Sequence, residues 1–379
     1  ISECLVGSEM CIRDRLTPEQ TVEFFLNIHQ PVRIDNAKEI LDYLLPLQDL
    51  WDSFRNEVYA QIILHMGEAY KLAGDIPAAI SFLTEHIEKY SSKWKYDYPL
   101  KSTMFHHLGI YHAESNHEEE ALEAFKKHVF YLLIDNQRYS NFEFYSFRSC
   151  SPHALEDLKN NTLTLSSPTQ FNDPLDCLIF PWIDTRKKAL TDARQNMAAE
   201  LLAKAYSYIK VRCFVRNTPL PTEAADDPLM RSSVQEQYNL LMWAHYAYNH
   251  TGYCVKYNFP ENFVYEDIPN STLSRLGNVD YVGKISLTDE LTLNDAFFKK
   301  SADWSYESEV RLLHYDPYFE GDFKSLTLPP NCVKEIYFGL KCTDENKAKI
   351  RKVLEGHAVH FYQIVTQSND LYSLASKPV

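Results

Sequence analysis

The sequence predicts an α+β chain with an N-terminal α-helical repeat domain and a C-terminal domain built on a mixed, mostly antiparallel sheet. Two segments in the first third share a helix-turn-helix pattern, and strand-type alternation of aromatic and β-branched residues replaces the helical period near residue 139. The 379 residues, 45% of them hydrophobic, exceed one typical domain of about 100–200 residues. We therefore predict domains at 16–138 and 139–379.

The first 15 residues, ISECLVGSEMCIRDR, resemble translated adapter sequence more than a domain edge, so we treat residues 1–15 as artefactual or disordered. The cysteines are scattered, with no CxxC pair and no zinc spacing, which predicts neither a disulfide framework nor a metal site. No run of about 18 apolar residues and no secretion signal occur. We expect a soluble, cytoplasmic protein with no membrane segment.

The helical part contains one clear internal repeat. LHMGEAYKLAGDIPAAISFLTEHIEKY, from Leu64, aligns with FHHLGIYHAESNHEEEALEAFKKHVFY, from Phe105, and both place a glycine before an aromatic residue and alanines after a polar turn. The pattern resembles the tetratricopeptide repeat, which implies hairpins with a concave surface that binds a peptide or another helix. A third, less regular hairpin is predicted from Pro18, with Thr17 as its N-cap.

The charge balance limits the partners of both domains. Formal net charge is -14, with 52 Asp and Glu against 38 Lys and Arg. Binding to a nucleic-acid backbone is not favoured, because it requires a basic surface. A peptide or protein partner of the helical repeats should be neutral or basic. The alternative is that this short array simply packs against its own C-terminal domain.

The C-terminal elements follow in order from residue 139. FEFYSFRS is a predicted strand, Ser151 caps a short helix from Pro152, and TLTLSS is a strand that runs into an Asn-Asp-Pro turn. A helix near 184–208 precedes further strands at YIKVRCFVRN, GYCVKYNF, NVDYVGKI and SEVRLLHY. The last elements are the strands VKEIYFGLK and HFYQIVTQ, with the helix TDENKAKIRKVLEG between them. Six or more strands with interspersed helices predict an α+β domain.

Five motifs in this domain carry a family resemblance. They are FRS, LSSPTQFNDPLD, LMWAHYAYNHTGYCVKY, KSADWSYESEVRLL and IYFGLK, in this order. The series resembles the bacterial domain-of-unknown-function family two-nine-seven-one, which implies a bacterial protein but no particular reaction. Relatives usually have Cys-Phe-Ser where this chain has Cys213, Phe214 and Val215, so any role of that serine hydroxyl is absent here.

A second resemblance concerns chemistry. The chain contains no GxGxxG, GxxxxGK[ST], HExxH or GxSxG motif. Arg148, serines after the second strand and Glu307-Ser308-Glu309 are similar in order to the arginine, serine and Glu-x-Glu of ADP-ribosyltransferases. This similarity implies an ADP-ribosyltransferase-like fold with NAD as the substrate. The alternative is that Glu-x-Glu is an edge-strand face whose charges pair in solvent.

The similarity implies a role for each catalytic candidate. Cleavage of nicotinamide from NAD passes through an oxocarbenium-like ribose, which the carboxylate of Glu309 would stabilise beside the 2′-hydroxyl. Arg148 would bind the pyrophosphate or the adjoining ribose through two hydrogen bonds. Glu307 would orient or deprotonate the acceptor nucleophile.

The residues expected to bind NAD combine aromatic walls with polar groups. Asn172 and Asp173 suit a turn fixed by side-chain hydrogen bonds to backbone amides. Trp243 is more often a core residue than a site residue. The candidates are Arg148, Tyr145, Ser166, Asn172, Asp173, Trp243, His245, Tyr246 and Arg311.

Three functions remain open at this point. The first is an NAD-dependent ADP-ribosyltransferase or NAD glycohydrolase whose helical repeats recruit a target, which requires Arg148 and Glu309 to face one cleft. The second is a non-catalytic protein- or ligand-binding module with structural carboxylates. The third is a metal-dependent nuclease, which requires four carboxylates to converge on Mg²⁺: Asp173, Asp176, Glu307 and Glu309.

Overall fold

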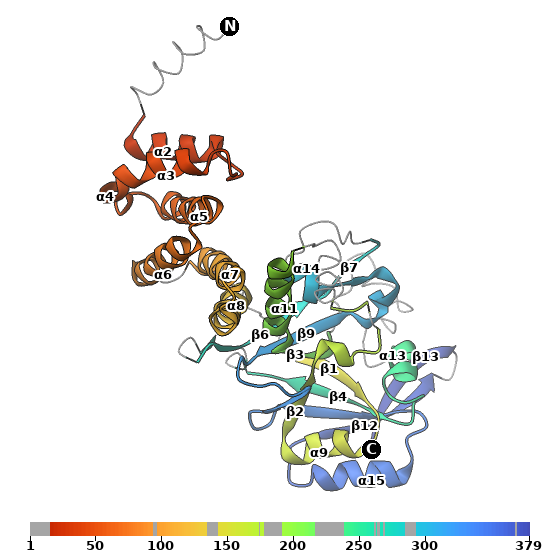
Figure 1. The fold of residues 1–379 in the computed structure, drawn as a ribbon. Helices are drawn as coiled ribbons and strands as arrows, with labels where there is room; N and C mark the ends of the chain where they lie inside the picture. Colours follow the sequence, from red (N-terminus) through yellow and green to blue (C-terminus); the bar gives the residue numbers. More distant parts are fainter. Residues whose placement is uncertain are drawn as a thin grey trace. The chain divides into compact units, whose positions relative to one another are not determined.

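A computed structural model gives the fold of the protein (Figure 1). It describes residues 16–93, 97–134, 143–173, 175–177, 192–216, 239–260, 263, 266–267, 270–284, 293–367 and 370–379. Two compact units make up the chain: Ile1–Leu132 with Lys187–Ala205, and Leu133–Arg186 with Tyr206–Val379. The predicted N-terminal segment 1–15 lies outside the described residues. The stretch 187–205, which the sequence analysis placed in the second domain, groups with the first unit.

The first unit is helical. Its start is fixed by a capping box, in which the backbone N–H of Gln20 donates to Thr17 Oγ1 at 3.2 Å and the Thr17 N–H donates to Gln20 Oε1 at 2.9 Å. Pro18 occupies the first helical position, as predicted. The helices are α2 (Pro18–Ile28), α3 (Ala37–Leu44), η1 (Leu45–Leu47), α4 (Gln48–Trp51), α5 (Asn56–Leu72), α6 (Ile76–Lys93), α7 (Tyr98–Glu114), α8 (Glu118–Leu133) and α11 (Ala193–Ser207).

The two self-similar segments form the helix pairs α5–α6 and α7–α8, each joined by three residues, 73–75 and 115–117. Their glycines permit close packing. A Cβ atom at Gly67 would lie 3.3 Å from the hydroxyl of Tyr111 on α7. At Gly109 it would lie 2.6 Å from Cε1 of the fully buried Phe125 on α8. Close packing therefore requires a glycine at position 109, between α7 and α8, more strictly than at position 67.

The second unit is built on an 11-stranded sheet in which β11–β12 is the parallel pair and the other pairs are antiparallel. The order along the main path is β13-β12-β11-β4-β1-β3-β9-β6-β5, and β2 and β10 branch from it. Strand β13, which follows β12 directly, was not predicted from the sequence. The strands are β1 (Glu143–Arg148), β2 (Thr162–Ser166), β3 (Ile209–Arg216), β4 (Tyr253–Asn258), β5 (Glu266–Asp267), β6 (Thr272–Asn278), β9 (Glu309–Tyr315), β10 (Phe323–Thr327), β11 (Val333–Phe338), β12 (His360–Gln367) and β13 (Asp370–Pro378). A separate parallel pair joins β7 (Asp280–Val282) to β8 (Lys299–Ser301).

Helices cover both faces of this sheet. On one face α9 (Pro152–Asn160) and α15 (Asp344–Val353) lie side by side (Figure 1) over a core that contains Phe144, Phe214 and Phe338. On the other face α13 (Leu240–His245) packs Met242 and Trp243 against β1 and β4. The C-terminal part is thus the mixed, mostly antiparallel α+β domain that the sequence predicted. The remaining short elements are η2 (Pro168–Gln170), α14 (Leu293–Phe298) and η5 (Ala302–Glu307).

The sheet forks at the middle of β3. Strand β3 pairs with β9 along its length, but on its other edge it meets β1 only at Tyr145↔Val215 and Phe144↔Arg216, and β2 only at Ser166↔Val211. Residues 212–214 therefore have no strand partner on that edge within the described part of the chain. Neighbouring residues of β3 point to opposite faces, so this gap gives access to both sides of the sheet.

Across the described helices, none combines the length and the apolar character that crossing a bilayer requires.

We predict that Gly109→Ala lowers the free energy of unfolding of the first unit by about 1–3 kcal/mol, because the new methyl group collides with the buried ring of Phe125. This loss should exceed the gain of about 1 kcal/mol in helix propensity. Gly67→Ala is the matched control and should be near neutral, because its Cβ would lie 3.3 Å from the Tyr111 hydroxyl and 3.4 Å from Cε2, without a collision. Urea denaturation of the full chain, followed by circular dichroism, measures both. Equal effects would contradict the packing role of Gly109.

Candidate functional site

A cavity of about 350 Å³ opens at the fork of the sheet. This volume lies near the lower end of the range for ligand-binding pockets. Residues from β1, β2, η2, the turn that follows it, β3, α13, β8, η5 and β9 line it, so it draws on segments that are far apart in the sequence. The lining residues are Tyr145, Ser146, Phe147, Ser166, Gln170, Phe171, Asn172, Asp176, Val211, Arg212, Cys213, Phe214, Val215, Met242, Tyr246, Lys300, Glu307 and Glu309.

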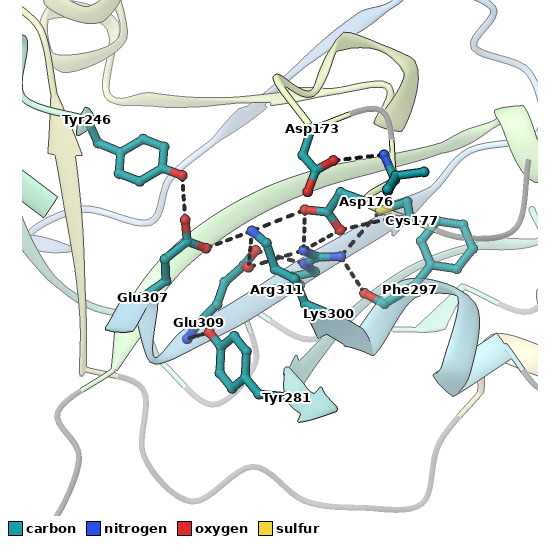
Figure 2. A network of polar contacts seen from close by, with 11 residues as sticks. Asp173, Asp176, Cys177, Tyr246, Tyr281, Phe297, Lys300, Glu307, Glu309 and Arg311 are labelled. Carbon is teal, nitrogen blue, oxygen red and sulfur yellow. Dashed lines mark hydrogen bonds and ion pairs between the residues drawn. The ribbon is translucent and has the colours of Figure 1, made fainter. Parts of the chain in front are cut away.

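A buried ionic network forms one wall of the cavity (Figure 2). Arg311 is fully buried, and its Nη2 donates to both carboxylate oxygens of Asp176 at 2.7 and 2.8 Å. Its Nε donates to Glu309 Oε1 at 2.7 Å, and its Nη1 donates to the carbonyl of Phe297 at 2.7 Å. A buried charge is stable only when it is paired and hydrogen-bonded. Arg311 meets that condition, and its partners come from three separate segments of the chain.

Lys300 is the second cation of the network. Its Nζ lies 2.7 Å from Glu307 Oε2, 3.3 Å from Glu309 Oε2 and 3.2 Å from Asp176 Oδ2. Three carboxylates and two cations thus occupy one buried cluster, and both cations bind more than one carboxylate. Arg311 itself does not line the cavity but holds the carboxylates that do.

The backbone around Ser308 brings Glu307 and Glu309 to this cluster. Helix η5 begins at Ala302 with Ser301 as its N-cap, and ends at Glu307. Ser308 has a left-handed backbone with φ 44°, and its carbonyl accepts from the N–H of Arg216 at 3.1 Å. Strand β9 then begins at Glu309, opposite Val215 of β3. The two glutamates consequently approach the cavity from different elements, one from a helix end and one from a strand.

Their surroundings shift the pKa values of the two glutamates in opposite directions. Burial raises the pKa of Glu307 above its usual value, although Lys300 and the hydroxyl of Tyr246, which donates to this carboxylate, partly oppose the rise. Burial alone would also raise the pKa of Glu309, but the ion pair with Arg311 outweighs it and lowers that pKa to about 2. One carboxyl group can therefore exchange a proton nearer to neutral pH, while its neighbour stays ionised.

The turn after β2 supplies Asp176. Asp173 Oδ1 accepts from the N–H of Leu175 at 2.9 Å, and the Cys177 N–H donates to Asp176 Oδ1 at 2.7 Å. Cys177 adopts a left-handed backbone with φ 53°. These local bonds aim the carboxylate of Asp176 at Arg311 and Lys300. The turn that is dense in Asn and Asp thus holds one anion of the network.

The structure brings together several residues that the sequence analysis selected. Glu307, Glu309 and Tyr246 line the cavity and contact one another directly or through Lys300. The other predicted binding residues that line it are Tyr145, Ser166 and Asn172. Arg311 joins them through Glu309 and Asp176.

Arg148 is not brought to these carboxylates, contrary to the expectation that it faces Glu309. Tyr145, Val215 and Glu309 are paired across β1, β3 and β9 and share one face of the sheet. Arg148 lies three residues after Tyr145 on the regular strand β1 and points to the opposite face. There its Nη2 donates to Asp157 Oδ2 of α9 at 2.7 Å.

Three further candidates lie outside the cavity lining. Trp243 is fully buried in the core, with its ring edge-on to Phe147 at 5.1 Å. His245 is exposed and contacts the Tyr306 hydroxyl at 3.3 Å through Nδ1. Asp173 accepts a hydrogen bond within its own turn and does not line the cavity. The other three carboxylates of the nuclease hypothesis do line it. An amphipathic segment gives no sign of which aromatic residue faces a cavity, which explains why Trp243 was selected together with Tyr246.

Sequence reasoning missed Lys300, Arg212 and Ser146. Lys300 stands seven residues before Glu307, inside the motif KSADWSYESEVRLL that carries the family resemblance, and this position was a usable signal. Arg212 alternates with Cys213 on a strand, and nothing local marks it. Its proximity to Ser146 of β1 depends on strand pairing that the sequence does not state.

Within the described ranges, no group of three or more His, Cys, Asp or Glu side chains has an arrangement that could hold a metal ion. The three cavity carboxylates that meet are bridged by Lys300 and Arg311 instead.

Residues 242–312 match a family model described as protein of unknown function (DUF2971). The match runs from α13 into β9 and contains Tyr246, Lys300, Glu307, Glu309 and Arg311. It confirms the family resemblance of the C-terminal part of the chain. No curated protein and no solved structure matches the chain.

We predict that Arg311→Met lowers the free energy of unfolding of the second unit by about 3–5 kcal/mol, because it leaves Asp176 and Glu309 buried with only Lys300 to compensate them. Lys349→Met is the control, since its partner Glu345 is 77% exposed and such surface pairs contribute about 0–1 kcal/mol. Guanidinium denaturation followed by tryptophan fluorescence measures the difference. A loss for Arg311→Met no larger than that for Lys349→Met would show that the network does not stabilise the fold.

Proposed function

We propose that the C-terminal unit cleaves the nicotinamide–ribose bond of NAD, as an ADP-ribosyltransferase or an NAD glycohydrolase, with the fork cavity as its site. The supporting observation is that Glu307 and Glu309 line one partly aromatic cavity and that their surroundings shift the two pKa values in opposite directions. Pairs of carboxyl groups with separated pKa values are typical of sites that combine charge stabilisation with proton transfer.

The chemistry assigns each carboxyl group a role. The C1′–N bond breaks and its electron pair leaves with nicotinamide, so positive charge develops on the ribose. Glu309, ionised and fixed by Arg311, lies ready to stabilise that charge without reorganisation. A water or acceptor hydroxyl then forms the new bond to C1′, and its proton passes to Glu307. A base needs a pKa near the working pH, and burial moves Glu307 in that direction.

Arg148 has no part in this proposal, because it does not line the cavity and binds Asp157 of α9 instead. Several aromatic rings line the cavity, among them those of Tyr145, Phe171 and Tyr246, and such rings would stack against nicotinamide. The nucleotide would therefore be held by a set of residues different from the one the sequence suggested.

We further propose that the helical unit is tetratricopeptide-like and recruits a peptide or protein partner of the enzyme in the bacterial cytoplasm. The packing of Tyr111 and Phe125 over the two repeated glycines supports this assignment, since small residues that admit the aromatics of a neighbouring helix are typical of such repeats. The acidic balance of the chain favours a neutral or basic partner.

A non-catalytic ligand-binding module is the second candidate, and one observation favours it. Glu309 is already bound by Arg311 at 2.7 Å and by Lys300 at 3.3 Å, so much of its charge is compensated before any substrate enters. If this compensation dominates, the carboxylates stabilise the fold and the cavity only binds. Measurements of NAD binding and of NAD cleavage separate the two candidates.

We predict that purified protein releases nicotinamide from NAD and that Glu309→Gln lowers the rate at least about 100-fold, because it removes the fixed negative charge. Glu335→Gln is the control, since Glu335 contacts Tyr337 on β11, outside the cavity lining. Chromatography of released nicotinamide gives the rate, and circular dichroism checks the fold. Binding of NAD without release would favour the binding module, and release unaffected by Glu309→Gln would remove the role given to Glu309.

A pH profile tests Glu307 as the base. Its ionised form is the active one, so the rate should fall as pH drops through its raised pKa and level off above it. Tyr246→Phe removes a hydrogen bond that lowers this pKa, so the acid limb should move to higher pH. Tyr337→Phe removes a similar Tyr–Glu bond at Glu335 and should leave the limb in place. An acid limb that does not move in Tyr246→Phe would exclude Glu307 as the titrating base.

A further inference from the structure

We propose that Arg212 and Ser146 form a phosphate-binding subsite at the second end of the fork cavity, for a ligand in which a phosphoryl group is attached to a ribose. The inference deepens the proposed function and rests on it for the ribosyl part of the ligand. The phosphate subsite itself rests on the geometry and charge around Arg212.

The position of Arg212 is fixed by β3 and by its neighbours on β1. Its Nη2 donates to Ser146 Oγ at 2.7 Å, and its guanidinium lies 6.0 Å from the ring centroid of Phe214. Both Arg212 and Ser146 line the cavity. The Nε of Arg212 is buried and has no hydrogen-bond partner. Buried donors are almost always paired, so an unpaired one requires an explanation.

In the described part of the chain, Arg212 also lacks a carboxylate partner of its own. Asp157, the carboxylate on this face, binds Arg148 through Oδ2 at 2.7 Å and accepts from Thr162 and Thr164 through Oδ1 at 3.2 and 2.7 Å. Among the residues that the structure describes, Arg212 has no ion pair. Burial, followed by the repulsion of Arg148, lowers the pKa of Arg212 to about 10, so it remains charged near neutral pH.

A partly buried guanidinium without an ion-pair partner lowers the stability of the fold. Such a group is expected where it binds a ligand. A phosphate oxygen in the cavity would accept from the guanidinium of Arg212, whose planar shape offers the paired donors that suit phosphate geometry. Ser146 Oγ already accepts from Arg212, and its own hydroxyl hydrogen is available to donate. The guanidinium thus presents only donors to the cavity, and the Ser146 hydroxyl can add one more.

The fork connects this subsite to the carboxylates. Arg212 and Phe214 point to one face of β3, while Cys213 and Val215 point to the face that carries Glu309, yet all four line the same cavity. A cavity with donors at one end and carboxylates at the other suits a ligand that carries a phosphoryl group and a hydroxylated sugar. Carboxylates bind sugar hydroxyls and would repel a second phosphate at their own end.

Nicotinamide mononucleotide and nicotinamide riboside differ by one phosphate and are the probes. Isothermal titration with the full chain should show that the mononucleotide binds about tenfold or more tightly than the riboside, as expected for a charge-assisted contact. Arg212→Met should abolish that difference and leave riboside affinity unchanged. Arg351→Met, which removes a guanidinium stacked on Phe361 of the same unit, should preserve it. Titration in the Glu309→Gln background keeps turnover slow during the measurement.

Stability distinguishes a ligand role from a structural one. If Arg212 serves the ligand, Arg212→Met folds with a free energy of unfolding equal to or above that of the wild type, whereas a structural arginine would lose stability. A phosphate preference without nicotinamide release supports the subsite and refutes the proposed catalysis. Equal affinities of the two probes, a preference that survives Arg212→Met, or no binding of either probe at millimolar concentration would overturn the subsite.

Discussion

The fully buried guanidinium of Arg311 is the constraint on which the C-terminal unit depends. A charge at that depth needs partners on all sides, and the chain supplies Asp176 from the turn after β2, Glu309 from β9 and the carbonyl of Phe297 from α14. Asp176 precedes the other two partners by more than a hundred residues, and the shared contact with Arg311 fixes the β2 turn and α14 relative to β9. Lys300 then balances the carboxylates that Arg311 leaves in excess. Buried ion pairs add little net stability, but they penalise any arrangement that leaves one partner alone.

The fork at β3 turns this structural cluster into the wall of a cavity. A strand that is paired on both edges along its whole length would separate the two faces of the sheet. Here β1 leaves β3 after Val215 and β2 joins it only at Val211, so the residues between them border open space. The side chains of Arg212 and Cys213, which belong to opposite faces, consequently line the same cavity. The positive end and the carboxylate end of the site are therefore set by strand alternation.

Local patterns predicted most of the elements, because caps and alternation are short-range signals. Thr17 and Ser151 cap the helices expected of them, and the strands β1, β2, β3, β9, β11 and β12 occur where alternation placed them. The assignment of Arg148 to the site was wrong, and the alternation of side chains along β1 already argued against it. Tyr145 and Arg148 are three positions apart on one strand, so both could not face Glu309. Arg212 could not be predicted, because its contact with Ser146 follows from how β1 diverges from β3.

The separation of the pKa values of the two glutamates follows from the backbone at one residue. In a regular strand, residues two apart share a face and have similar surroundings, and Glu307 and Glu309 would then compete for the same cations. The left-handed Ser308 breaks the strand between them. Glu307 remains at the end of η5, where it binds Tyr246 and Lys300, while Glu309 enters β9 beside Arg311. The first environment favours proton exchange and the second favours a permanent charge, so a single serine conformation separates a potential base from a potential electrostatic stabiliser.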